Sequence, residues 1–142
     1  NVNYQFQPGA WGRFEVGLEA THTGLLTTSV TGTTFTRTDD TTAQPDWSGR
    51  LDLRWSKGPL RLTYQLNYLS DVLRAANATV ENDPNPFVDQ NVTHNISGQY
   101  DLGPWQLRAG IVNLTDEEPS YPTLNYGDII GRQWFAGVRV KF

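Results

Sequence analysis

Residues 132 to 142 read RQWFAGVRVKF, and along this stretch apolar side chains alternate with polar or small ones. One set points to one side and consists of Trp134, Ala136, Val138, Val140 and Phe142. The other set points to the opposite side and consists of Gln133, Gly137, Arg139 and Lys141. A side-chain period of two with one apolar face predicts a β-strand that is buried on one side only.

The same period recurs along the chain. Its clearest occurrence runs from Trp47 to Ser56, where Trp, Gly and Leu alternate strictly with Ser, Arg and Asp. Segments 13–20 and 60–68 repeat the pattern with Phe, Val, Leu and Tyr on one side. We therefore expect seven strands, at about residues 1–7, 12–22, 46–57, 59–70, 91–102, 104–114 and 131–142.

The connections between these strands alternate in length. Short turns are expected at residues 8–11, 57–59 and 102–104, and long loops at residues 23–45, 71–90 and 115–130. In an antiparallel up-and-down sheet this order puts every tight turn at one end and every long loop at the other, as in bacterial outer-membrane barrels. A soluble sandwich has no reason to sort its loops in this way.

The composition narrows the class of protein. Charged residues make up 18% of the chain, and mean hydropathy is -0.51. The sequence has no run of about 18 apolar residues, so we expect no helical membrane span. A net charge of -4 with scattered arginines argues against nucleic acid as a partner. Cysteine is absent, so disulfides and thiolate chemistry are not expected. The chain starts within an alternating stretch without a signal segment, and we interpret it as a fragment cut inside a strand.

Strand length and aromatic placement favour the wall of a transmembrane barrel. A strand of about 11 residues, tilted by about 45°, rises roughly 25 Å, which matches the apolar band of an outer membrane. Trp47 and Trp55 bracket one apolar stretch, and Trp134 and Phe142 repeat their spacing. Trp and Tyr prefer the membrane–water interface because the ring is apolar and its N–H or O–H needs a wet partner. The predicted interface aromatics are Trp47, Trp55, Tyr68, Tyr100, Trp105, Trp134 and Phe142.

Four further elements carry a resemblance to a known family. They are the segment from Pro45 to Leu51, the hairpin with Gly58-Pro59-Leu60 and Tyr68-Leu69-Ser70-Asp71, the segment Asn113-Leu114-Thr115-Asp116-Glu117-Glu118-Pro119, and the stretch from Gly131 to Phe142. Over nearly its whole length the chain resembles the C-terminal part of the β-barrel domain of a TonB-dependent outer-membrane receptor. Thr115 stands where the family usually has an aromatic residue.

The resemblance implies an all-β fold, a transmembrane antiparallel up-and-down β-barrel of about 22 strands, of which residues 1–142 form about the last seven. The plug domain, the N-terminal strands and the segment that contacts TonB would precede Asn1. The implied function is energised uptake of a large, scarce nutrient across the bacterial outer membrane, most often an iron-siderophore complex. The implied partners are outer-membrane lipid, the plug, the TonB complex, a small-molecule ligand, and the barrel-assembly machinery, which would bind the strand ending in Phe142.

Two groups of candidate functional residues follow. In the family the polar wall surrounds the plug, and the lumen- or plug-facing candidates are Arg50, Asp52, Arg54, Arg61, Arg108 and Arg139. The same charges also fit a hydrated ladder that only keeps the inner wall wet. External loops meet a ligand first, and the ligand candidates there are Arg74, Asn77, Phe87, Tyr121, Asn125 and Tyr126. Aromatic and amide groups suit a sugar, whereas arginine with tyrosine suits an anionic iron chelate.

The sequence predicts no catalytic, cofactor or metal site, and we expect no enzyme. His22 and His94 have no partner at metal-ligand or acid-base spacing, and the acidic run 116–118 lacks the pattern of a calcium loop. Within transport, the competing interpretation is a passive or substrate-specific channel or porin without a plug. Among other classes of protein, the competing interpretations are an outer-membrane enzyme or adhesin barrel, and a soluble antiparallel sheet such as a carbohydrate-binding sandwich.

Overall fold

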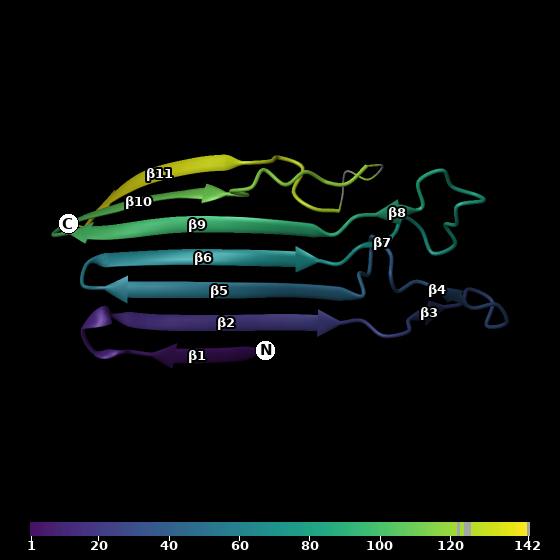
Figure 1. The fold of residues 1–142 in the computed structure, drawn as a ribbon, viewed down its shortest axis with the longest axis horizontal. Helices are drawn as coiled ribbons and strands as arrows, with labels where there is room; N and C mark the ends of the chain where they lie inside the picture. Colours follow the sequence, from purple (N-terminus) through teal and green to yellow (C-terminus); the bar gives the residue numbers. More distant parts are fainter. Residues whose placement is uncertain (122, 124–125, 142) are drawn as a thin grey trace.

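In the computed structural model, which describes residues 1–121, 123 and 126–141, the chain forms one long antiparallel sheet (Figure 1). Its strands lie side by side in chain order, β1-β2-β5-β6-β9-β10-β11. They are β1 (Val2–Phe6), β2 (Arg13–His22), β5 (Trp47–Lys57), β6 (Leu60–Leu69), β9 (Asn91–Leu102), β10 (Trp105–Val112) and β11 (Gln133–Val140). The predicted all-β class and the seven antiparallel strands are confirmed, and the sheet that this chain forms is open, not closed into a barrel.

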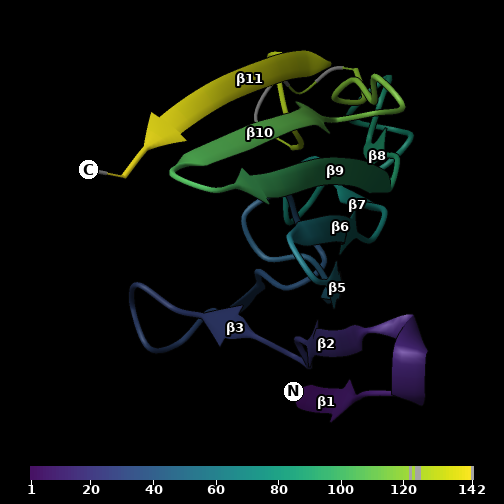
Figure 2. The same ribbon diagram turned by 90° about the vertical axis from the view of Figure 1, so that its left-hand side faces the viewer.

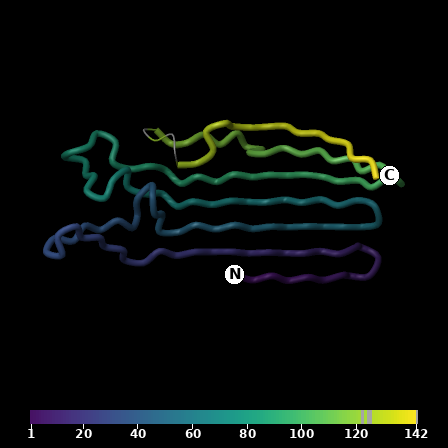
Figure 3. The backbone as a smooth tube through the Cα atoms, turned by 180° about the vertical axis from the view of Figure 1, so that it is seen from behind, coloured from purple at the N-terminus to yellow at the C-terminus, as the bar shows by residue number. Residues whose placement is uncertain are grey.

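The tight turns lie at one end of the sheet and the long connections at the other, as predicted (Figures 1 and 3). The turn end holds the 3-10 helix η1 (Gly9–Trp11) and two Gly-Pro turns. Gly58 and Gly103 have φ values of 56° and 58°, and the proline after each fixes a negative φ. This combination suits a type II′ hairpin turn, whose first central residue is glycine. No helix among the described residues is long and apolar enough to cross a membrane.

The long connections at the loop end contain short strands of their own. We call residues 23–46 the first loop, residues 70–90 the second loop and residues 113–132 the third loop. The first loop holds the pair β3 (Thr27–Thr28) and β4 (Thr36–Arg37), and the second holds β7 (Val72–Leu73) and β8 (Phe87–Val88).

The register of the strands keeps an apolar face and a polar face apart. Leu53 of β5 lies opposite Val16 of β2 and Tyr64 of β6, while the next residue, Arg54, lies opposite Glu15. Because side chains alternate along each strand, this register aligns apolar residues with apolar residues across most of the sheet. Exceptions are Phe135, which lies opposite Gly110 on the polar face, and His94, which lies opposite Leu66 on the apolar face.

The hydrophobic core lies in the loops and not in the sheet. Figure 2 shows the strands from β1 to β11 in a single layer. The buried apolar residues of the described part of the chain are Val72, Ala78, Val88 and Tyr126, all from the second and third loops. Large apolar side chains of the sheet stay accessible, among them Trp134 at 73% and Val138 at 62%. The sheet therefore presents both of its faces to its surroundings.

Candidate functional site

The polar face carries a hydrogen-bonded ladder that crosses three strands. The Arg50 guanidinium donates to the Asp52 carboxylate at 2.9 Å, and the Gln65 amide donates to the same carboxylate at 3.0 Å. The Asn95 amide donates to Gln65 Oε1 at 3.0 Å, and its own oxygen accepts the Asn113 backbone N–H at 2.9 Å. The ladder thus connects β5, through β6 and β9, to the residue that follows β10.

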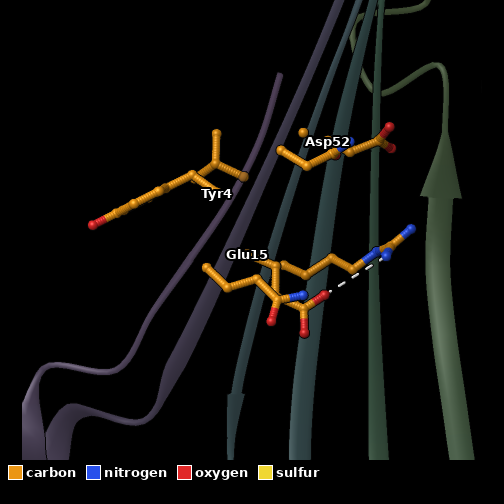
Figure 4. A pocket seen from close by; sticks show the side chains of 8 residues that line it. Tyr4, Glu15 and Asp52 are labelled. Atoms are coloured by element: carbon orange, nitrogen blue, oxygen red, sulfur yellow. Dashed lines mark ion pairs between the residues drawn. The ribbon is translucent and has the colours of Figure 1, made fainter. Parts of the chain in front are cut away.

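Ion pairs on the same face join neighbouring strands. Arg54 of β5 lies 3.7 Å from Glu15 of β2, and Arg61 of β6 lies 3.5 Å from Asp101 of β9. Figure 4 shows Glu15 with its ion pair and Asp52 nearby. Because both arginine side chains are well exposed to solvent and the two carboxylates are partly exposed, each pair contributes little to stability by itself. Together they form a wet, charged wall.

All six predicted lumen-facing residues occupy positions on the polar face: Arg50, Asp52, Arg54, Arg61, Arg108 and Arg139. The first four belong to the ladder and the ion pairs. Arg108 lies over the backbone of Gly137, where an added Cβ would come within 2.9 Å of Arg108 Nε. Arg139 makes no ion pair within the described part of the chain.

The apolar face carries an aromatic band at each end of the strands. The turn-end band contains Trp55, Tyr100 and Trp105, and the loop-end band contains Trp47, Tyr68 and Trp134. These are six of the seven predicted interface aromatics, and the seventh, Phe142, lies outside the described residues. Figure 4 shows Tyr4 pointing to the opposite side of the sheet from Asp52, in agreement with the separation of the two faces.

Trp55 of the turn-end band and His22 beside the loop-end band have hydrogen-bonded ring nitrogens near the strand ends. At the turn end, Trp55 Nε1 donates to the Trp11 carbonyl at 2.8 Å. At the loop end, the ring of His22 stacks on Trp47 with centroids 4.4 Å apart, and His22 Nδ1 lies 3.0 Å from the Asp46 carbonyl. Trp55 and His22 thus each combine an aromatic ring with a hydrogen-bonded ring nitrogen, an arrangement that suits an interface between an apolar and an aqueous medium.

The Asn-Leu-x-Asp motif closes the base of the third loop. Asn113 is fully buried with φ of 52°, and its side chain exchanges two hydrogen bonds of 2.8 Å with the backbone of Glu117. Asp116 accepts the backbone N–H of Arg132 at 2.7 Å. Asparagine tolerates the left-handed conformation at the first position. The motif therefore ends β10 and fixes the chain just before β11 begins.

The three loops pack into one cluster, which we call the loop cap. Tyr126 of the third loop packs against Val72 and Val88 of the second, and all three are at most 3% exposed. The first loop joins through its Asp40 carbonyl, which accepts the backbone N–H of Leu73 at 2.9 Å. Contacts between residues far apart in sequence thus hold the loop cap together.

The arginines of the first two loops are held by buried carboxylates. Arg37 binds Asp39 at 2.6 Å, and Arg74 Nε donates to Asp83 at 2.6 Å. The Arg37 hydrogen bond lowers the pKa of Asp39. The Asn85 backbone N–H, together with Arg74, lowers the pKa of Asp83. Both carboxylates therefore stay ionised and keep their guanidinium partners.

The predicted ligand residues differ in their exposure to solvent. Phe87 and Tyr121 are accessible, at 64% and 80%. Asn77 is exposed, and its carbonyl accepts the Asn82 amide at 2.9 Å. Tyr126 departs from the expectation of a ligand contact, since it is only 2% exposed and serves as the core of the loop cap. Asn125 lies outside the described residues.

The two histidines make hydrogen bonds within the sheet and its loop end. His94 Nδ1 lies 2.7 Å from the Tyr64 hydroxyl. Over the residues that the structure describes, no group of three or more His, Asp or Glu side chains has the geometry of a metal site.

Sequence reasoning missed Gln65 and Asn95, which complete the polar ladder, and Asp39 and Asp83, which hold the loop arginines. Period-two spacing placed Gln65 on the polar face but could not show which residue would lie beside it. Register supplies this information, since Gln65 pairs with Asp52 on one side and Asn95 on the other.

Comparison of the chain with protein-family models, curated proteins and solved structures found no match.

Proposed function

We propose that this chain is the C-terminal wall of the β-barrel of a TonB-dependent outer-membrane receptor, which imports a large, scarce nutrient. An iron-siderophore complex is the leading substrate class. The observation that carries the proposal is a single-layered sheet with one apolar face, one charged face and no core of its own. Its accessible surface of 9904 Å² exceeds the roughly 7,400 Å² expected for a folded monomer of 16.0 kDa. Such a sheet needs an apolar medium on one face and water on the other.

Lipid is the medium that fits the apolar face. Strand β5 has 11 residues, which at about 3.3 Å each and a tilt of about 45° span roughly 25 Å of membrane. The two aromatic bands lie at the ends of this span, where outer-membrane barrels carry their girdles. This supports a transmembrane location for the sheet.

The polar face fits the lumen of a large barrel. Its ladder and ion pairs leave the side chains of Arg54 and Arg61 60% exposed, so they remain free to contact a plug or water. Charge-assisted hydrogen bonds of this kind can exchange partners when a plug moves. In this proposal the wall holds the plug at rest and releases it during transport.

The open edges indicate what completes the barrel. Strands β1 and β11 have no outer partner among the described residues, and each unpaired backbone group in hydrocarbon costs several kcal/mol. With seven alternating strands, β1 and β11 run in the same direction (Figure 1). A second copy in the same orientation would therefore pair β11 with β1 in parallel, whereas outer-membrane barrels are antiparallel. An odd number of further strands from the same polypeptide satisfies both edges.

The test is the intact mass of the native polypeptide, recovered from outer membrane with an antibody against residues 115–131. A mass several times 16.0 kDa supports the receptor, and a mass near 16.0 kDa contradicts it. Uptake by that polypeptide should stop when the proton-motive force is dissipated. Uptake that continues at the same rate would instead indicate a channel without a plug.

A further inference from the structure

The polar face contains a hollow of about 430 Å³ at the turn end, which we call the turn-end hollow. It lies against β2, β5 and β6, beside the hairpin turn at Gly58. Its charged and hydroxyl-bearing lining residues are Arg13, Glu15, Arg54, Ser56, Arg61 and Thr63. One water takes up roughly 30 Å³ in the liquid, so the hollow has room for a small ion with some of its hydration.

Strand register brings the three arginines of the hollow together. Ser56 of β5 lies opposite Arg13 of β2 on one side and Arg61 of β6 on the other. Arg54, two residues before Ser56, lies opposite Glu15 of β2. Residues at these positions share the polar face because side chains alternate along each strand. Three neighbouring strands thus each contribute one guanidinium group to the same hollow.

These guanidinium groups are held only loosely by carboxylates. Glu15 lies 3.9 Å from Arg13 and 3.7 Å from Arg54. Asp101 lies 3.5 Å from Arg61. Charge-assisted hydrogen bonds are shorter, at about 2.7–2.9 Å. Within the described part of the chain, none of the three arginine side chains donates a hydrogen bond. An incoming anion can therefore bind their N–H groups without breaking a hydrogen bond within the chain.

The turn-end hollow carries a positive charge. Its lining has three Arg against one Glu, a net charge of +2. The polar face stays positive when the rows from Glu15 to the turns are taken together, with five arginines against two carboxylates, a net charge of +3. These residues are Arg13, Arg54, Arg61, Arg108, Arg139, Glu15 and Asp101. Anions should therefore gather at this end of the polar face.

We propose that the turn-end hollow is a binding site for a doubly charged oxyanion of the phosphate class. A phosphate monoester carries about -1.5 to -2 charges at pH 7 and presents three strong acceptor oxygens. Its charge complements the +2 of the lining, and the planar fork of each arginine suits phosphate oxygens. The Ser56 and Thr63 hydroxyls are further donors. A monocarboxylate supplies fewer oxygens and only half of the charge.

In the proposed receptor this site binds a chemical group of the cargo. The polar face then lines the lumen, and the tight turns lie at the periplasmic end, so a nutrient meets the hollow late in its passage. This role rests on the proposed function, whereas the binding of phosphate does not. The same chemistry fits inorganic phosphate and a phosphate group on a larger nutrient, and the experiment distinguishes the two.

The test is equilibrium dialysis of radiolabelled inorganic phosphate against the full-length protein in non-ionic detergent and low-salt buffer. Binding should saturate, and acetate should displace the label about tenfold or more less effectively than unlabelled phosphate, because it carries one charge. Displacement by glycerol 2-phosphate as effective as by phosphate identifies the phosphate group of a larger solute, and displacement by inorganic phosphate alone identifies the free ion. Absence of saturable binding, as when a plug carboxylate fills the hollow, overturns the proposal, and so does acetate that competes equally.

Three variants locate the bound phosphate. Arg54→Gln should weaken binding by about tenfold or more, because hydrogen bonds to a charged group are lost. Glu15→Gln removes the competing carboxylate and should strengthen binding, a gain that misfolding does not imitate. The matched control is Lys57→Gln, which removes the same charge one residue after Ser56, on the opposite face of β5, and should leave the affinity nearly unchanged. Equal losses in Arg54→Gln and Lys57→Gln would indicate general charge attraction and overturn the site.

Failure of this inference is distinguishable from failure of the proposed function. A polypeptide several times 16.0 kDa that shows energised uptake and binds no phosphate would refute the phosphate site and leave the receptor function intact. Phosphate binding with the expected response to the variants, in a polypeptide near 16.0 kDa, would refute the receptor function and leave the phosphate site intact.

Discussion

The Tyr126 hydroxyl donates a hydrogen bond of 2.5 Å to the backbone carbonyl of Ser70, a residue 56 positions earlier in the chain. Burial raises the pKa of Tyr126 to about 12, so the phenol stays protonated and remains a donor at neutral pH. This bond joins the third loop to the point where β6 passes into the second loop. The loop cap therefore behaves as one unit and not as three separate loops.

Tyr126→Phe should loosen the loop cap without disturbing the sheet. The Ser70 carbonyl would lose its buried donor, at a cost of about 1–3 kcal/mol in the free energy of local opening. Amide hydrogen exchange should become faster across residues 70–90 and 115–130 and stay unchanged in β5 and β6. The matched control is Tyr121→Phe, since Tyr121 is 80% exposed. Equal exchange in the two variants would show that the bond does not hold the loops.

Acid should open the loop cap through Asp39 and Asp83. The pKa of each is lower in the folded chain than the ordinary 3.8, Asp39 chiefly through Arg37 and Asp83 chiefly through the Asn85 N–H. Their stabilisation is therefore complete above that value and is lost as the pH falls through the folded pKa. We expect protection from proteolysis in residues 23–46 and 70–90 to fall below about pH 4.

Asp40 changes the stability of the loop cap with pH in the opposite direction, because burial raises the pKa of Asp40. Its protonation favours the folded loop cap, so protection should not fall as the pH is lowered from 7 towards 4. The double variant Asp39→Asn, Asp83→Asn should be less protected at pH 7 and nearly independent of pH below 4. A steep loss of protection in the unmodified chain between pH 7 and 5 would contradict this assignment.

Gly110→Ala should destabilise the β9–β10–β11 part of the sheet. Phe135 is an aromatic residue on the polar face, and a Cβ at position 110 would lie 2.6 Å from its ring and 2.7 Å from the Ile96 carbonyl oxygen. Because the carbonyl is backbone, the clash cannot be relieved by a rotamer change, and overpacking of this kind costs about 1–3 kcal/mol. The control is Gly49→Ala, where the nearest atom is 3.5 Å away. Heat-modifiability in SDS gels of the full-length protein would compare the two.

Leu53→Arg and Ser97→Arg place the same charge at the same depth on opposite faces of the sheet. Leu53 aligns with Tyr64 and Ile96 on the apolar face, and Ser97 follows Ile96 on the polar face. If lipid covers the apolar face, Leu53→Arg should cost about 2–4 kcal/mol and reduce the folded amount in the outer membrane. Ser97→Arg should be nearly neutral. Similar losses in both variants would argue against a lipid-facing side.

Much of the fold follows from short-range pattern. The expected segments 46–57 and 91–102 correspond to Trp47–Lys57 and Asn91–Leu102, and both Gly-Pro turns fall where expected. The last strand is shorter than expected, ending at Val140 among the described residues, and its Phe135 lies on the polar face. The aromatic ring there covers Gly110, a pairing that depends on the register of β10 and β11.

The candidate site was less accessible to sequence reasoning. The residue type of Arg74 and Tyr126 suggested ligand contacts, yet one is held by Asp83 and the other forms the core of the loop cap. The local sequence does not show that Arg74 and Tyr126 are engaged by other loop residues while Tyr121 stays exposed.

The sequence by itself determined the seven strands, their two faces and the sorting of turns and loops. It did so because side-chain alternation and turn chemistry act over a few residues and can be read without knowledge of the neighbours. Only the tertiary structure decided which polar side chains join into a ladder, which loop arginines are neutralised and which tyrosine is buried. These outcomes depend on strand register and on contacts between distant loops. Burial and pairing there lower the free energy only after the chain has brought the partners together.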